Sequence, residues 1–131
     1  MIRLAIPSIE LQKAVYQALN NGEYPVYEIL PTDTAMPYIT IGDEILTEDN
    51  TKTTKRTVHN ITINTWSKGF DSTASKQMNH MVMSAILNLT IVSGFLVDII
   101  TLELLETLQE QQNDGSAIWH GVLQFEVTLS H

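Results

Sequence analysis

The run RTVHNITINTWS, residues 56–67, constrains the fold of this chain more than any other stretch. Its side chains alternate, and in a β-strand successive side chains point to opposite faces of the sheet. One face would carry Ile61, Ile63 and Thr65, and the other would carry Asn60, Thr62, Asn64 and Trp66. The pattern predicts a β-strand in a sheet that has one covered face.

Two further runs give this strand its neighbours. Residues 38–49, YITIGDEILTED, are rich in β-branched and aromatic side chains, and Gly42 is a candidate for a bulge or bend. Because the polar turn NTKTTK joins this run to residues 56–67, the two strands should form an antiparallel hairpin. A last strand, residues 117–130, places five apolar side chains on one face: Trp119, Leu123, Phe125, Val127 and Leu129.

A short segment near the N-terminus also has strand character. Val26, Tyr27 and Ile29 lie between Pro25 and Pro31. Proline cannot donate a backbone hydrogen bond, so this strand is confined to a sheet edge or a strand end.

Residues 96–109 fit two structures. The leucines and glutamates at the end of this run, from Leu102 to Leu108, could continue as a helix. Valine, isoleucine and phenylalanine dominate its start, and apolar residues on both faces are typical of a strand that is buried on both sides. We therefore predict a strand, joined to the last strand by a turn at Asp114-Gly115.

Two segments change to a helical period of three and four residues. The first helix is predicted over residues 8–20, with Ser8 as a candidate N-cap and Asn21-Gly22 as a candidate stop. The second is predicted over residues 72–89, capped by Asp71 or Ser72. It carries one apolar stripe, formed by Met78, Met81, Val82, Ala85, Ile86 and Leu89.

These elements predict an α+β fold in the order α-β-β-β-α-β-β. The hairpins make the sheet antiparallel, with a mixed sheet as the alternative, and the two amphipathic helices should pack on one face of it. A length of 131 residues suits one domain over residues 1–131, and no repeat or linker interrupts the chain.

Composition excludes several kinds of site. The chain has no cysteine, which rules out disulfides, thiolate catalysis and cysteine-based metal sites. The opening MIRLAIPSIELQKAV lacks the apolar run and cleavage site of a signal peptide. The most apolar stretch, residues 91–105, contains Asp98 and Glu103 and is too short to span a bilayer. We therefore expect a soluble protein, made in the cytoplasm, without a membrane partner.

Charge is distributed unevenly. The formal net charge of −8 argues against nucleic-acid binding, since such proteins gain affinity from Lys and Arg at the phosphates. Residues 51–76 nevertheless carry five basic side chains and one acidic, whereas residues 77–131 carry six acidic and none that is Lys or Arg. If the fold keeps these segments apart, one positive pole faces a negative remainder, which suits head-to-tail contact between copies.

Few residues could support catalysis. The glycines form no phosphate-binding loop, and the histidines show no metal-ligand spacing. His59 and His120 could meet across the sheet beside a carboxylate, as an enzyme would need, but two half-exposed strand positions are the plainer interpretation. Asp43 and Glu44 are interpreted as a solvated acidic strand end. We predict a protein that is not an enzyme, with no catalytic residue, no cofactor and no metal.

The order of several motifs resembles one protein family. LQKAVYQALN is followed by PVYEILPTDTAMPYITIGDEI, then by KTTKRTVHNITINTWSKG, a helix and a final GVLQFEV strand. Over nearly the whole chain this order is similar to the tail-completion proteins of long-tailed bacteriophages, also called tail-to-head joining or tail-terminator proteins. The resemblance implies a structural virion protein without catalysis. It also implies a ring, typically of six copies, that caps the head-proximal end of the tail tube and docks on the head connector.

The same resemblance implies the partners. They are copies of the chain itself, although the isolated protein could be a monomer, together with the tail-tube protein and the head-completion or connector protein. Genomic DNA would pass through the ring without specific binding. The implied location is the virion tail at the head–tail interface, after assembly in the host bacterial cytoplasm. A small α+β ligand-binding or regulatory domain, with a pocket between sheet and helices, is the alternative function.

The basic run TKTTKR marks the candidate protein interface. The resemblance implies a mobile hairpin loop at about residues 47–57 that becomes ordered only against a neighbouring molecule. Its cations would meet acidic patches on an adjacent subunit, on the tube or on the connector. Two alternatives are an exposed hairpin tip kept soluble by its charges and a weak contact with DNA phosphates. The candidate interface residues are Lys52, Lys55, Arg56, Glu48 and Asp49.

Overall fold

The computed structural model describes residues 5–20 and 22–131 of the chain. The expected order α-β-β-β-α-β-β is confirmed, and the fold is α+β. The predicted stop at Asn21 and the first four residues of the opening segment lie outside the described residues. None of the described helices is long and apolar enough to cross a membrane. The elements are α1 (Pro7–Asn20), β1 (Val26–Tyr27), β2 (Tyr38–Glu48), β3 (Arg56–Gly69), α2 (Thr73–Leu87), β4 (Leu96–Gln111) and β5 (Ala117–Ser130).

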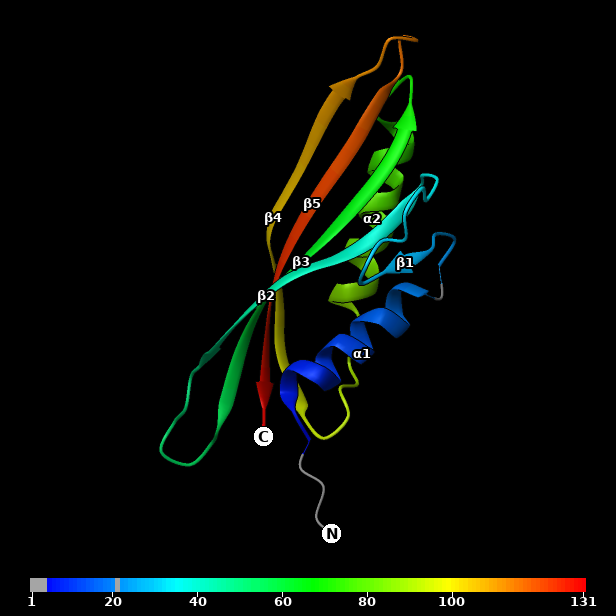
Figure 1. Cartoon of the computed structure of the whole chain (residues 1–131). Helices are drawn as coiled ribbons and strands as arrows, with labels where there is room; N and C mark the ends of the chain where they lie inside the picture. Colours follow the sequence, from blue (N-terminus) through cyan, green and yellow to red (C-terminus); the bar gives the residue numbers. More distant parts are fainter. Residues whose placement is uncertain (1–4, 21) are drawn as a thin grey trace.

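The five described strands form one mixed sheet in the order β1-β2-β3-β5-β4 (Figure 1). Among these strands β1 and β2 pair in parallel, over residues 26–27 and 39–40, and the other pairs are antiparallel. The strand β3, whose alternation is the clearest in the sequence, pairs with β5 along its whole length. A shift in register between Ile41 and Glu44 confirms the bulge expected at Gly42.

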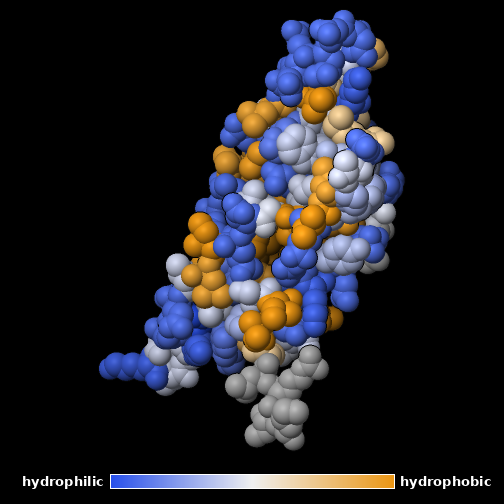
Figure 2. Space-filling model, in the orientation of Figure 1, coloured by the Kyte–Doolittle hydropathy of each residue, from blue (hydrophilic) through white to orange (hydrophobic). Residues whose placement is uncertain are grey.

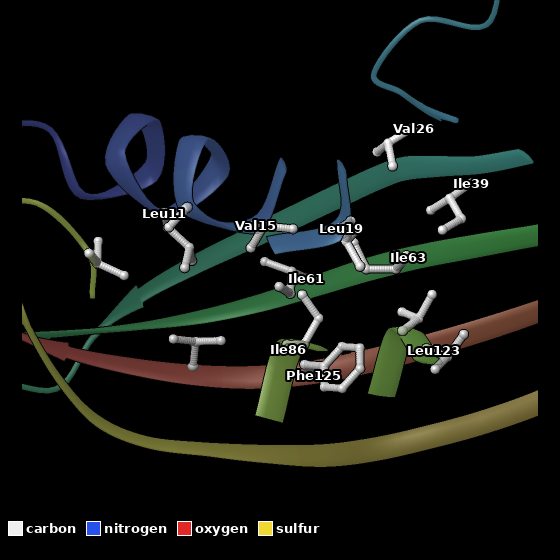
Figure 3. Packing of buried hydrophobic residues seen from close by; sticks show 14 of the residues in the cluster. Leu11, Val15, Leu19, Val26, Ile39, Ile61, Ile63, Ile86, Leu123 and Phe125 are labelled. Atoms are coloured by element: carbon white, nitrogen blue, oxygen red, sulfur yellow. The ribbon is translucent and has the colours of Figure 1, made fainter. Parts of the chain in front are cut away.

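The core lies between the sheet and the two helices. Figure 3 shows Leu11, Val15 and Leu19 of α1 directed toward Ile61 and Ile63 of β3. The centre is filled by fully buried side chains from three elements: Ile86 on α2, Ile63 on β3, and Leu123 and Phe125 on β5. The apolar faces that were predicted for β3 and β5 are therefore the faces that the helices cover.

The first helix start differs from the expectation, whereas the second agrees with the predicted cap at Asp71 or Ser72. The first helix begins at Pro7, so Ser8 lies inside it and is not its cap. Proline suits a first helical position, because the backbone N–H that it lacks would have no partner there. At the start of α2, the backbone N–H of Thr73 donates to the Asp71 carboxylate at 2.9 Å, whereas Ser72 makes no side-chain capping bond.

A buried asparagine, Asn79, links α2 to the sheet through hydrogen bonds. Asn79 of α2 is buried and accepts a hydrogen bond from the Thr65 hydroxyl of β3, and its own amide donates to Thr107 of β4 at 3.3 Å. The amide lies directly on the backbone of Gly121 in β5. Glycine is needed at that position because a side chain there would occupy the space of Asn79 and Thr65.

The strand β4 departs most clearly from its expected environment. Residues 96–111 do form a strand, but it is the outermost strand of the sheet and is not buried on both sides. Register shifts at 97/99 and 102/104 mark two bulges. Each bulge moves the following residues to the other face, so a single alternation cannot run through the whole strand.

The predicted single positive pole is also wrong. Figure 1 places the turn between β2 and β3 at the opposite end of the sheet from the turn between β4 and β5. Lys52 and Lys55 lie at the first end, whereas Lys68 reaches Asp114 at the second end, at 3.4 Å. The basic segment is divided because β3 runs the length of the molecule.

Candidate protein-interaction surface

The hairpin tip, which we define as residues 49–55, is a hydrogen-bonded turn between β2 and β3. The backbone N–H of Asp49 donates to the Arg56 carbonyl at 3.0 Å, and the N–H of Thr51 donates to the Thr54 carbonyl at 2.8 Å. The N–H of His131 also donates to the Lys55 carbonyl at 2.9 Å. The strands β2 and β3 are already paired at residues 48 and 57. Mobility of residues 47–57 therefore stays a prediction.

The Arg56 side chain forms ion pairs and a hydrogen bond within the chain. Its guanidinium forms an ion pair with the Asp49 carboxylate, donates to the Asp49 carbonyl at 3.3 Å, and lies 4.0 Å from the Asp98 carboxylate of β4. The side chain thus ties the base of the tip to the beginning of β4. Because both carboxylates are partly exposed, these ion pairs each contribute little to stability.

Lys52 and Lys55 behave differently from Arg56. Both side chains are exposed, and neither ammonium forms an ion pair with any described residue. Glu48 is also exposed and accepts a hydrogen bond from the Asn50 amide at 3.1 Å. Of the five candidate interface residues, the two lysines are thus the cations that remain available to a partner.

A buried polar chain lies at the root of the hairpin. The His59 ring is fully buried, and its Nε2 lies 2.9 Å from the Thr57 hydroxyl, which is 3.3 Å from Nε2 of His131. Its Nδ1 faces Glu44 at 3.7 Å and has no hydrogen-bond partner among the described residues. Burial lowers the pKa of His59, and the nearby Glu44 carboxylate opposes that shift. The folded structure therefore favours the neutral imidazole.

His120 lies on the opposite face of the sheet. Its ring stacks on Trp66 with 3.7 Å between ring centroids, and its Nε2 lies 2.8 Å from the Asn64 amide oxygen. Burial lowers the pKa of His120, and Glu106 opposes the shift. Because His59 faces the helices and His120 faces away from them, the two histidines do not meet. The joint histidine site that an enzyme would need is not formed.

The described carboxylates form no metal site, and the hollows beside the helices differ greatly in size. No group of three or more acidic or histidine side chains that could hold a metal occurs within residues 5–20 and 22–131. The hollow between α1 and the sheet, lined by residues such as Leu11, Glu44 and Ile63, has a volume of about 30 Å³. Pockets for small ligands usually measure about 300–1,000 Å³. A metabolite would not fit between the sheet and α1. The hollow between α2 and β4, lined by residues such as Asn79, Met83 and Leu105, is larger and measures about 400 Å³.

The open face of β4 is a surface that the sequence interpretation missed. After its second bulge, Leu104 and Leu108 pair with Gln124 and His120 of β5, so they lie on the face away from the helices. Their exposed fractions are 39% and 44%. Hydrophobic residues in Figure 2 lie along the margin that β4 occupies in Figure 1. The irregular spacing of these leucines was the available signal, but it fitted a helix equally well.

Comparisons with known proteins identify the fold and the family of this chain. One solved structure, a chain from the virion of a native gene transfer agent particle, has the same fold with a TM-score of 0.81 at 19% sequence identity. The match covers 98% of this chain and 100% of that chain. No curated protein matches the sequence. The family model described as tail completion protein gp17 matches residues 11–130. The chain therefore belongs to the tail completion protein gp17 family, and it is a structural protein of a phage virion tail.

Proposed function

We propose that this tail protein forms a ring on the head-proximal end of the tail tube, where it stops tube growth and joins the tail to the head connector. The observation that carries the proposal is the family match, which extends over residues 11–130. The solved chain with the same fold comes from a virion-like particle, which supports a role inside an assembled particle.

The shape of the chain supports a role in assembly. The β2–β3 hairpin extends beyond the helices, as Figure 1 shows, and its tip carries the two lysines that pair with no described residue. An arm of this kind can reach a neighbouring molecule that the compact part of the chain does not touch. A contact between different surfaces of identical copies closes into a ring when the rotation between them permits it.

The proposed partners follow from this position. They are copies of the chain, the tail-tube protein and the head-completion or connector protein. DNA would pass through the ring without specific binding, because a net charge of −8 disfavours phosphate contacts. We propose no catalytic step, since His59 and His120 lie on opposite faces of the sheet and no group of three acidic or histidine side chains in the described part of the chain could hold a metal.

The genetic experiment is removal of the gene from the phage or prophage, followed by negative-stain microscopy of the tails. We expect overlong or headless tubes, and complementation by the wild-type chain should restore joined particles. Normal tail length and normal joining without the protein would refute the proposal.

A variant experiment separates the hairpin tip from the fold. Lys52→Glu with Lys55→Glu should impair joining, and Arg56 is left in place because it stabilises the base of the tip. The matched control is Lys13→Glu with Lys76→Glu, which reverses two exposed lysines on the helices. Joining should also weaken at high salt, since the screening length falls from about 10 Å at 0.1 M to about 3 Å at 1 M. If the tip variant joins as well as the control, the tip has no such role.

A further inference from the structure

Among the charged side chains that form no ion pair with a described residue, two sets of opposite sign lie on the hairpin tip and on β4. Lys52 and Lys55 form one set at the hairpin tip. Glu106 and Glu110 of β4 form the other, and neither makes an ion pair with a described residue. Both glutamates lie on the open face of the sheet, because they pair with Val122 and Ile118 of β5.

These sets cannot meet within one chain. The register of β3, β5 and β4 places Glu110 beside Ile118 and Lys68, whereas the tip begins beyond Arg56. Twelve residues of strand separate Arg56 from Lys68, which is roughly 40 Å at about 3.3 Å per residue. The two sets lie toward opposite ends of the sheet in Figure 1. Only a second molecule can bring them together.

Apolar side chains accompany both sets. On β4, Leu104 and Leu108 alternate with the two glutamates on the open face. On the hairpin, Ile45 is 65% exposed and pairs with Asn60, on the same open face of the sheet. The distance along the strand from Ile45 to the start of the tip at Asp49 is roughly 13 Å, and from Leu104 to Glu110 it is roughly 20 Å, at about 3.3 Å per residue. Both surfaces therefore place apolar side chains beside charges, and the charges of the two surfaces have opposite signs.

We propose that the β2–β3 hairpin of one copy lies along the open face of β4 of the next copy. Lys52 and Lys55 would meet Glu106 and Glu110, and Ile45 would pack against the leucines between them. The contact joins two different surfaces, so each copy uses its hairpin on one neighbour and its β4 on the other. This inference rests on the proposed ring and names the contact that forms it.

Disulfide trapping tests the contact directly, because the chain has no cysteine of its own. A variant with Lys52→Cys and Glu110→Cys, oxidised at high protein concentration and low salt, should give a ladder of reducible oligomers that extends beyond the dimer. The matched control is Lys13→Cys with Glu110→Cys, which keeps the β4 cysteine and moves its partner to exposed α1. A control ladder of equal strength, or no ladder for the test variant, would overturn the contact.

Charge exchange gives an independent measurement. Lys52→Glu with Lys55→Glu, and Glu106→Lys with Glu110→Lys, should each weaken association at least tenfold in sedimentation velocity. The variant that carries all four changes should recover most of that loss, because the charges again have opposite signs. Circular dichroism and thermal unfolding establish that each variant is folded. Failure of the fourfold variant to recover would also overturn the contact.

The outcome for the contact is separable from the outcome for the proposed function. Rings seen by native mass spectrometry, or joined tails in complementation, without a specific ladder would refute this contact and leave the ring proposal intact. A specific ladder together with normal tails in the absence of the gene would establish the contact and refute the proposed function.

Discussion

The close contact between the Asn79 side chain and the backbone of Gly121 allows a direct test of what stabilises this fold. In Gly121→Ala, the new Cβ would lie 2.9 Å from Cγ of Asn79 and closer still to Asn79 Oδ1 and Thr65 Oγ1. Carbon atoms do not approach so closely, so the Asn79 side chain must move away from the sheet. We expect the hydrogen bonds from Thr65 and to Thr107 to be lost with that movement.

The magnitude follows from three terms. Overpacking a filled core costs about 1–3 kcal/mol. Each of the two lost hydrogen bonds contributes about 0.5–1.5 kcal/mol. Replacing a strand glycine with alanine returns about 0.5–1 kcal/mol through a smaller loss of chain entropy. The expected decrease in the free energy of unfolding is therefore about 3 kcal/mol, which a domain with a stability of about 5–15 kcal/mol can survive.

Urea unfolding, followed by the fluorescence of Trp66 and Trp119, measures this decrease. The decisive control introduces Gly121→Ala into a background with Thr65→Ala and Asn79→Ala, where the space for the methyl group is free. In that background Gly121→Ala should lower the free energy of unfolding by less than about 1 kcal/mol, because substitutions of residues in contact have non-additive effects. If Gly121→Ala lowers the free energy of unfolding equally in both backgrounds, or not at all in the wild-type background, the contact between Asn79 and Gly121 does not require a glycine.

Three other predictions concern the core, the buried histidine and the tip. Phe125→Ala should lower the free energy of unfolding by about 3–5 kcal/mol in urea unfolding, because the ring is fully buried, and a loss below about 1 kcal/mol would contradict this packing. Burial lowers the pKa of His59 below 6.5, so the unfolded chain binds a proton more readily than the folded chain. The free energy of unfolding should therefore fall as the pH drops below 6.5, by at most about 1.4 kcal/mol per pH unit from this group. His59→Gln should flatten that pH dependence, and an unchanged slope between pH 5 and pH 7.5 would argue against it. Arg56→Gln should change global stability by less than about 1 kcal/mol yet speed amide hydrogen exchange at Thr51 and Thr54, and equal exchange rates would mean that the arginine does not hold the tip.

Patterns that are local in the chain predicted its structure correctly. The alternation in residues 56–67 and 117–130 follows from the pleat of a strand, and the apolar spacing of residues 72–89 follows from the turn of a helix. Each of these patterns is complete within a single segment. The element order and the fold class could therefore be predicted from the amino-acid sequence.

Predictions failed where a residue's environment is made by distant segments. His59 was expected at a half-exposed strand position, but it is fully buried beside Thr57 and Glu44. The prediction of the candidate interface failed for the same reason, because it grouped Arg56 with the two tip lysines. Its pairing with Asp49 and Asp98 depends on β4 lying close to the hairpin root.

The sequence by itself determined which segments become strands and helices, and its motif order resembled the tail-completion family that the family match then confirmed. Only the tertiary structure decided that β4 is an outer strand with exposed leucines, and that the basic segment is divided between two ends of the sheet. The physical reason is that periodicity is set by neighbours along the chain. Strand order and charge pairing are instead set by the total burial and hydrogen bonding of the whole sheet, to which every segment contributes.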